Sequence, residues 1–342
     1  MTFMKIEENG RRIRNISELA KLAGVSAGTV SRALAGKDLV NQQTRERIQA
    51  LAREHGFRPN QMASRLRTGQ TGVIGVVVPL GHERAQGLAD PFFTTLLGYL
   101  ADAVSERGYD LMLSRQVSTD DDEWLERIVD SGMLEGVLVI GQSDQFDTIE
   151  RVAASYQPLV AWGTHRPDQR HCAVGTDSFE GGRKAAAHLI DGGAKHIAFL
   201  GETTGIEIAE RLAGAQAVAE ERGVRLDAFP TRLAIDGEAA QVREHVAALD
   251  PATDAIFAAS DVIAMAVLRV LHELGRKVPD DIAVIGYDDL PLAMHTVPRL
   301  TSVQQDIAGG ARAMVDTLFR RMRGEDAGPT VLEARVMARE SA

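Results

Sequence analysis

The sequence is poor in the residues that carry redox, metal or membrane chemistry. Its single cysteine, Cys172, can form no disulfide within the chain, so a reducing cytoplasm is the expected setting. No apolar run approaches the roughly 20 residues that span a bilayer. Charged residues near the N-terminus stand where the apolar region of a secretory signal would lie. These absences predict a cytoplasmic protein without a membrane segment.

Motifs of catalysis and cofactor binding are absent as well. The sequence has no GxGxxG or phosphate-loop lysine motif, and its nine histidines are dispersed without metal-ligand spacing. The scattered Ser, His and Asp residues match no recognised enzyme pattern. We therefore expect a protein that is not an enzyme and that needs no cofactor or metal.

Positive charge is scarce overall but concentrated at one end. The formal net charge is −10. Residues 1–70 hold 13 Lys/Arg against 6 Asp/Glu, a balance of +7, which leaves −17 for the remainder. Phosphate contacts need Lys and Arg, and an acidic surface repels nucleic acid. A basic head on an acidic body therefore predicts that only the head meets DNA.

The head has the pattern of short helices. Asn15 and Glu18 have capping-box spacing, and Gly24 suits the left-handed residue that ends a helix. Ser26 follows a tight turn and can cap a second helix, and a third helix is predicted to begin at Asn41. Two short helices joined through a glycine turn, plus a third helix, predict a helix-turn-helix unit.

From residue 72 the pattern alternates between short apolar runs and helical segments. The apolar runs are residues 73–78, 110–113, 136–140, 159–161, 196–200, 255–258 and 282–285. Such alternation is typical of parallel α/β sheets, and about 270 residues exceed what one sheet usually needs. We therefore expect two lobes, with a ligand beyond the carboxyl ends of the strands.

Polar and aromatic side chains follow several of these runs. They are Asp90, Phe92, Phe93, Trp162, Asp177, Arg211, Ser260, Asp261 and Asp288. Carboxylates accept hydroxyl protons, a guanidinium donates in pairs and an indole can cover an apolar sugar face, so the set fits a polyhydroxylated ligand. Simpler alternatives stay open. Phe92 and Phe93 can be core residues, Asp261 can be a helix N-cap, and Asp288 can be a turn residue.

One long segment resembles a known family. "ISELAKLAGVSAGTVSRALAGKDLVNQQTRERIQALAREHGFRPNQMASRLRTGQTGVIGVVVP" is similar to the N-terminal signature of the LacI family of transcriptional regulators. The likeness continues through "DPFF", "RLAG", "SDVIAMAVLRVLHELGRKVPDDIAVIGYDDLPLA" and "VMARES", and so covers nearly the whole chain. It implies an all-α helix-turn-helix domain, a hinge helix and a two-lobed, periplasmic-binding-protein-like α/β core with parallel sheets.

The resemblance implies roles in DNA binding for the second helix and the hinge. Positions matching base readers are Ala27, Gly28 and Arg32, and those matching phosphate contacts are Ser26, Thr29, Ser31 and Asn41. Residues 58–69, "RPNQMASRLRTG", match the hinge helix, which is too short to be stable alone in water. Hinge positions matching operator contacts are Asn60, Ala63, Arg65 and the minor-groove wedge Leu66. The alternative for this segment is a plain linker.

The resemblance also implies an effector site in the body. Arg211 and Asp288 match the principal effector contacts, Phe92, Phe93 and Ser260 match lining positions, and Asp177 and Gln305 match more weakly near the lobe junction. The sequence departs from the family pattern at two points. Asp90 replaces the usual Asn before "PFF", and no aspartate follows "PLVAW". The hydroxyl partner supplied there in other members must lie elsewhere in this chain if it is present.

These observations predict a domain order and a function. The predicted segments are a disordered extension (1–10), the helix-turn-helix domain (11–58), the hinge helix (59–70) and the body (71–342), with lobes of about 72–174 with 305–328, and about 175–300 with the C-terminal strand. We expect a homodimeric repressor of carbohydrate-utilisation genes, released from a pseudopalindromic operator by a neutral sugar, and similar to members tied to α-glucoside use. The alternatives are a transport-type sugar-binding protein, a co-repressed regulator and one that depends on a protein co-effector.

Overall fold

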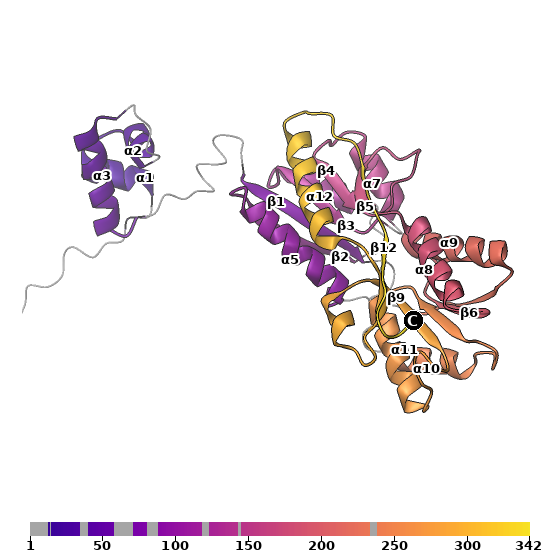
Figure 1. Ribbon diagram of the computed structural model, residues 1–342. Helices are drawn as coiled ribbons and strands as arrows, with labels where there is room; N and C mark the ends of the chain where they lie inside the picture. The colour runs from indigo at the N-terminus through magenta and orange to yellow at the C-terminus, as the bar shows by residue number, and fades with distance from the viewer. Residues whose placement is uncertain are drawn as a thin grey trace, which may run out of the picture. The chain divides into compact units, whose positions relative to one another are not determined.

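The chain forms two compact units, which we call the head (Met1–Thr71) and the body (Gly72–Ala342). The computed structural model describes residues 13, 15–34, 40–57, 71–80, 88–117, 123–142, 145–232 and 238–342 (Figure 1). The predicted extension 1–10 and the hinge residues Asn60, Ala63, Arg65 and Leu66 lie outside these ranges. No helix in the described part of the chain is long and apolar enough to cross a membrane.

The described residues of the head form three helices whose ends follow the predicted capping residues. They are α1 (Ile16–Ala23), α2 (Ala27–Leu34) and α3 (Gln42–Glu54). The Asn15 side chain accepts the Glu18 N–H at the start of α1, Gly24 ends that helix with φ 64°, and Asn41 accepts the Thr44 N–H at the start of α3. The predicted helix-turn-helix unit is thereby confirmed.

Apolar side chains from all three helices form the centre of the head. Leu19, Val30, Ala33 and Ile48 are fully buried there. The third helix also fixes the first by a polar contact, because the Arg47 guanidinium donates to the Ala23 carbonyl at 2.9 Å. The apolar faces of the three helices are therefore buried against one another. The outward face of α2 stays exposed and can contact another molecule.

The first lobe of the body is a six-stranded parallel sheet covered by helices on both faces. Its strand order is β11-β5-β4-β3-β1-β2. The strands are β1 (Val73–Leu80), β2 (Asp110–Val117), β3 (Gly136–Ile140), β4 (Leu159–Trp162), β5 (Cys172–Thr176) and β11 (Thr330–Leu332), and the helices are α5 (Pro91–Ser105), α6 (Trp124–Val129), α7 (Phe146–Ala153) and α12 (Ile307–Met322).

Alternate residues of the central strands pack on opposite faces of this sheet. Leu138 and Ile140 of β3 face the cluster that contains α5 and α12, whereas Val137 and Val139 face α6 and α7. Helices α5 and α12 lie side by side (Figure 1). Burial of both faces explains why these strands are continuous apolar runs in the sequence.

The second lobe repeats the architecture with one antiparallel edge. Its strand order is β12-β10-β9-β8-β6-β7, and only the β10–β12 pair is antiparallel. The strands are β6 (His196–Leu200), β7 (Arg225–Phe229), β8 (Ala255–Ala258), β9 (Ala283–Asp288), β10 (Thr301–Gln304) and β12 (Arg335–Met337), and the helices are α8 (Ser178–Asp191), α9 (Ile206–Arg222), α10 (Glu238–Ala247), α11 (Asp261–Glu273) and the short 3-10 helix η2 (Pro291–His295).

Two glycines let α8 and α9 approach each other closely. A Cβ atom on Gly182 would collide with the Arg211 carbonyl, and one on Gly214 would collide with the Phe179 carbonyl. The close crossing fixes the position of Arg211 on α9. A predicted effector residue is thus held by backbone packing and not by its own side chain alone.

The chain passes between the two sheets three times. The passages follow β5, β10 and β11, so strand 301–304 belongs to the second lobe and strand 330–332 to the first. The expected lobe limits at residues 300 and 328 fall a few residues short of these strands. All seven apolar runs overlap strands, and the expected C-terminal strand is β12, whereas β5, β7, β10 and β11 were not among the expected strands.

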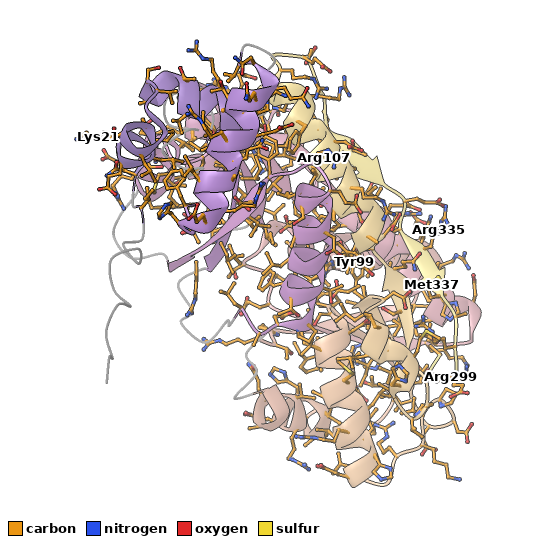
Figure 2. The ribbon with its side chains drawn as sticks, turned by 90° about the vertical axis from the view of Figure 1, so that its left-hand side faces the viewer. Lys21, Tyr99, Arg107, Arg299, Arg335 and Met337 are labelled. Atoms are coloured by element: carbon orange, nitrogen blue, oxygen red, sulfur yellow. The ribbon has the colours of Figure 1, made fainter. Side chains whose placement is uncertain are left out.

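The C-terminal segment is fastened to the second lobe by its polar residues. Strand β12 pairs with β10 through Ser302 opposite Met337, and Figure 2 shows Arg335 and Met337 on this strand. Glu340 accepts from Arg299 at 2.9 Å, and the Ser341 hydroxyl donates to the Val284 carbonyl at 2.6 Å. The closing "VMARES" motif is therefore built into the second sheet.

Candidate functional site

The outward face of α2 carries the head residues assigned to base reading. Ala27, Gly28 and Arg32 are exposed, while Val30 and Ala33 of the same helix are buried. The Arg32 guanidinium folds back along the helix, since its Nη2 lies 3.9 Å from the position of a Cβ on Gly28. The two positions therefore share one face, and an arginine there can donate two hydrogen bonds to a guanine edge.

Several residues assigned to phosphate contacts also cap helices. The Ser26 hydroxyl accepts the Thr29 N–H at 3.1 Å and contacts the Thr29 hydroxyl at 2.9 Å. Asn41 uses its amide oxygen to cap α3, and its amide nitrogen is the donor that a phosphate needs. These side chains stand at helix N-termini, where the free peptide N–H groups and the helix dipole favour an anion.

A second polar cluster lies in the body around Arg211 and Asp288. The Arg211 guanidinium is 3.7 Å above the Tyr287 ring and donates to the Ala259 carbonyl at 2.6 Å. Its Nε is buried and has no hydrogen-bond partner among the described residues. Gln305 donates its amide to Asp288 at 2.7 Å. Three residues assigned to the effector therefore meet at one point of the second lobe.

The backbone around Asp288 has an uncommon conformation. Asp288 and Asp289 have φ of 112° and 54°, values that non-glycine residues rarely adopt. Neighbouring groups hold this turn in place. Asp289 receives hydrogen bonds from Arg339 at 2.5 Å and from Gln304 at 2.9 Å. A strained turn fixed in this way is frequent at binding sites.

The fully buried carboxyl of Asp261 supports the same turn from beneath. It accepts the Leu290 N–H at 2.7 Å and the Ser302 hydroxyl at 2.6 Å. Ser260, not Asp261, is the N-cap of α11, because its hydroxyl accepts the Ile263 N–H. The interpretation of Asp261 as an N-cap is therefore wrong, while Ser260, assigned to the effector lining, has a capping role.

The first lobe contributes Asp90 to this cluster. Asp90 caps α5 by accepting the Phe92 N–H at 2.8 Å, and it is near enough to Asp288 to raise the pKa of that carboxyl. Burial raises the pKa of Asp90 itself, against the effect of the Phe92 and Phe93 N–H groups. Carboxyl groups from both lobes thus face each other, and their protons are retained at a higher pH than usual.

Burial dominates the electrostatics of the cluster. It raises the pKa of Asp288 to about 7, an effect that Arg211 opposes and Asp90 reinforces. Burial likewise raises the pKa of Asp261, and the charge of Asp288 adds to that effect. Near neutral pH Asp288 can therefore change between a hydrogen-bond donor and an acceptor.

The predicted aromatic residues adjoin the cluster on the first-lobe side. The Phe92 ring packs edge-on against Phe93 at 5.7 Å and against Trp162 at 5.9 Å. Trp162 is 4% exposed and lies in the hydrophobic core, with Gly310 of α12 directly against its ring. In this arrangement Phe92 and Phe93 are half-buried, and Trp162 acts as a support behind Phe92.

Asp177 belongs to a different group at the lobe junction. It caps α8 by accepting the Glu180 N–H at 2.9 Å, and its charge raises the pKa of Glu210 on α9. Glu210 is hydrogen-bonded to Thr164 of the first lobe. Asp177 therefore lies beside the contact between Glu210 and Thr164, which the sequence did not predict.

The predictions missed Gln142 and Glu207, which meet at Gly163. A Cβ atom on Gly163 would lie 2.5 Å from the Gln142 amide nitrogen and 2.6 Å from a Glu207 carboxyl oxygen. Gly163 follows β4 at the position where the expected aspartate is absent, and Glu207 brings a carboxylate there from the opposite lobe. Gln142 could have been found, since it follows β3 as the other candidates follow their strands.

Comparison with known proteins assigns both units. Residues 15–60 match the family of bacterial regulatory proteins, lacI family, and residues 186–342 match the periplasmic binding protein-like domain. The HTH-type transcriptional regulator CelR of Thermobifida fusca is 34% identical over 341 residues, which cover 97% of this chain and 99% of CelR.

Two solved structures agree with the fold along almost the whole chain. The transcriptional regulator CelR in complex with cellobiose aligns with a TM-score of 0.69 and 32% identity, covering 96% of this chain and 100% of that one. The lac repressor dimer bound to operator and the anti-inducer ONPF aligns with a TM-score of 0.83 and 22% identity, covering 96% and 98%. The predicted fold, a helix-turn-helix unit with a two-lobed α/β body, is confirmed.

Proposed function

The chain belongs to the LacI family of bacterial regulatory proteins, and from this we propose that it is a DNA-binding repressor of carbohydrate-utilisation genes that a small neutral sugar releases from its operator. It acts as a homodimer in the cytoplasm, and the two-fold symmetry of a dimer calls for a pseudopalindromic operator. A relative with 32% identity is solved with cellobiose, and the lac repressor is solved as a dimer on operator.

The observation that carries the effector site is the buried polar cluster drawn from both lobes. Asp90 comes from the first lobe and Arg211 and Asp288 from the second, and all three are at least nine-tenths buried. Buried polar groups are normally hydrogen-bonded, so the Arg211 Nε without a described partner favours a ligand acceptor at this point. A hydroxyl can accept from Arg211 and donate to a carboxylate at the same time.

The chemistry of the cluster favours an uncharged ligand over a phosphate. The cluster holds two carboxyl groups, Asp90 and Asp288, and one guanidinium, Arg211, so an added anion would meet like charge as soon as either carboxyl is ionised. Glu207 lies one turn before Arg211 on α9, about 6 Å along the helix, and extends the polar face towards Gly163. A ligand that contacts both ends carries separated hydroxyl groups, as a glucose-containing disaccharide does.

In the head, we assign base reading to Arg32 with Ala27 and Gly28, and phosphate contacts to Ser26, Thr29, Ser31 and Asn41. Exposure of Ala27, Gly28 and Arg32, together with the positive charge of residues 1–70, supports this assignment. The roles of Asn60, Ala63, Arg65 and Leu66 in the hinge rest on the sequence resemblance alone. Linkage makes the control reciprocal: an effector that weakens operator binding is itself bound more weakly by the operator complex.

A thermal-shift screen of the full chain tests the effector class. The panel holds glucose, maltose, cellobiose, purine bases and glucose 6-phosphate, because a ligand that binds only the folded state raises the melting temperature. We expect a shift with one neutral glucoside, and no shift with that sugar in the Arg211→Ala variant. A shift confined to a purine or to the sugar phosphate would overturn the neutral-sugar assignment. Maltose and cellobiose separate α- from β-linked glucosides.

Electrophoretic mobility shift of the same protein tests the regulator itself. Bound operator fragments are first selected from random DNA, and the responding sugar is then added to the complex. Release of the DNA supports repression relieved by the sugar. Tighter binding would show a co-repressed regulator, and recovery of no preferred sequence would contradict a sequence-specific DNA-binding function.

A further inference from the structure

A chain of buried hydrogen bonds runs from the surface of the first lobe to the lobe junction. Glu150 on α7 contacts the His171 Nδ1 at 2.6 Å, and the His171 Nε2 contacts the Gln142 amide oxygen at 2.7 Å. The Gln142 amide nitrogen then donates to the Thr164 carbonyl at 2.6 Å. The His171 side chain is fully buried, so none of these contacts is replaced by solvent.

The chain ends at two carboxyl groups of the second lobe. Thr164 is hydrogen-bonded to Glu210 of α9, and Glu207, one turn earlier on the same helix, lies against Gly163. Segment 163–164 therefore stands between Gln142 on one side and α9 on the other. At this segment the first turns of α9 meet the first lobe.

With the Gln142 amide in this orientation, a doubly protonated His171 satisfies both of its ring contacts. The Glu150 carboxylate is an acceptor, because it also receives the N–H groups of Arg170 at 2.8 Å and of His171 at 2.9 Å. The Gln142 oxygen is an acceptor as well, since its amide nitrogen is used at Thr164. Both ring nitrogens of His171 therefore face acceptors, and both must carry hydrogen.

A neutral His171 forces a different arrangement. One ring nitrogen keeps its hydrogen for Glu150, and Nε2 becomes an acceptor. The Gln142 amide must then turn so that its nitrogen donates to His171, which points its oxygen at the Thr164 carbonyl oxygen. Two acceptors cannot bond, so segment 163–164 loses its support.

We propose that His171 is a positioning residue of the lobe junction: its protonation sets the orientation of the Gln142 amide and thereby holds or releases segment 163–164 against Glu207 and Glu210 of α9. The device concerns the body alone and holds whether or not an effector is bound. Acid favours the held form, and alkali favours the released form.

The groups around His171 set the pH range. Burial lowers the pKa of His171 below its usual value, Glu150 opposes this, and His165 on the loop after β4 reinforces it. The Phe146 ring of α7 packs edge-on against the His171 ring, with 5.3 Å between the ring centres. The Arg166 guanidinium lies over the same Phe146 ring, 5.0 Å from its centre. At the junction, burial raises the pKa of Glu210, so this carboxyl also gains a proton more readily on acidification.

Nitrogen NMR of the full chain labelled at histidine and at the glutamine amide tests the proposal between pH 5 and 8. His171→Gln and Gln142→Met assign the two signals. We expect His171 to pass from two ring N–H groups to one with a midpoint below about 6.5, and the Gln142 amide signals to shift with the same midpoint. A His171 ring that keeps one state throughout, or one that titrates while Gln142 stays constant, would overturn the proposal.

Hydrogen exchange of the peptide 159–171, corrected for the intrinsic effect of pH, tests the structural consequence. We expect protection of 163–164 to fall about tenfold from pH 5 to pH 8, the smaller end of the range for one lost buried hydrogen bond. His171→Gln keeps a donor towards Gln142 but cannot titrate, so the tenfold fall in protection should be lost, and any smaller change that remains reports the titration of Glu210. His165→Asn should keep the wild-type response; its loss would make His165 the sensor and refute the assignment to His171.

Discussion

In the described part of the head, the side chains assigned to base reading, Ala27, Gly28 and Arg32, are exposed around a small apolar centre. In the body, four side chains assigned to the effector, Asp90, Arg211, Asp288 and Gln305, are buried and interact with one another. Arg32 is exposed, whereas Arg211 stacks on Tyr287 and donates to Ala259. Two arginines of the same chain therefore differ in what their loss changes: binding alone in the head, binding together with packing and protonation in the body.

The largest effect is expected for Arg211→Ala. Loss of a buried charged hydrogen-bond donor should weaken effector binding on the order of 100-fold, the upper range for one charged hydrogen bond. Operator affinity without effector should be unchanged, because Arg211 lies in the body. Titration of the responding sugar by calorimetry and of operator by gel shift measures both. Arg211→Lys keeps the charge but lacks the planar fork, so it should recover little of the affinity; loss of operator binding in a folded variant would contradict the assignment.

The next effect is a pH dependence of stability that belongs to the body. An unfolded Asp has a pKa of about 3.9, whereas burial raises the pKa of Asp288 to about 7. Between these values the folded protein holds a proton that the unfolded chain has released. Stability should therefore fall as pH rises from about 4 to 7 and then level off.

Urea unfolding of the full chain at several pH values measures this dependence. Asp288→Asn should reduce the slope between pH 4 and 7 without abolishing it, since the pKa of Asp261 is raised as well. Glu244→Gln, an exposed change on α10 of the same lobe, should leave the slope nearly unaltered. An unchanged slope in Asp288→Asn would show that Asp288 keeps an ordinary pKa in the folded protein.

The same contrast explains how far the sequence predicts each unit. Caps such as Asn15 and Gly24 contact residues within one helical turn of their own position. The interactions that define the helices of the head are therefore local, and these helices can be predicted from residue spacing. The strands missed in the body are mostly three to five residues long, and β7 mixes exposed and half-buried positions. Such short strands carry a weak pattern, whether at the edge as β7 and β11 or inside the sheet as β5 and β10, because pairing with a distant partner and not local preference fixes them.

The effector residues show a similar division. Arg211, Asp288, Asp90 and Gln305 were found from their positions after strands or from the family signature, and the structure brings them together. Glu207 was missed because nothing within α9 indicates that its carboxylate reaches Gly163 of the other lobe. A contact between the lobes joins two segments that are far apart in the sequence. The local residue pattern of one segment does not indicate which distant segment lies next to it in space.

Arg32→Ala and Arg47→Ala form a matched pair that tests the outward face of the head. Arg32→Ala should cost about 1–3 kcal/mol of discrimination at one base pair of each half-site, with stability within about 0.5 kcal/mol of wild type. Arg47 donates to the Ala23 carbonyl and so joins α3 to α1. Its loss should destabilise the head by about 1 kcal/mol and weaken all operator sequences alike. Binding to a library of single-base operator variants, with thermal melting of each protein, separates the two outcomes.

The smallest effects test whether a helix cap can also be a DNA contact. Asn15 caps α1 and Asn41 caps α3 through the same amide-oxygen contact, at 2.9 and 2.8 Å. Each change to Ala should therefore cost about 1 kcal/mol of stability. Only Asn41→Ala should also weaken binding to every operator and lower the salt dependence of affinity, because a lost phosphate contact releases fewer counterions. If operator affinity depended on salt equally in the two variants, Asn41 would be a helix cap without a phosphate contact. Other donors of the head would then have to fix its position along the DNA.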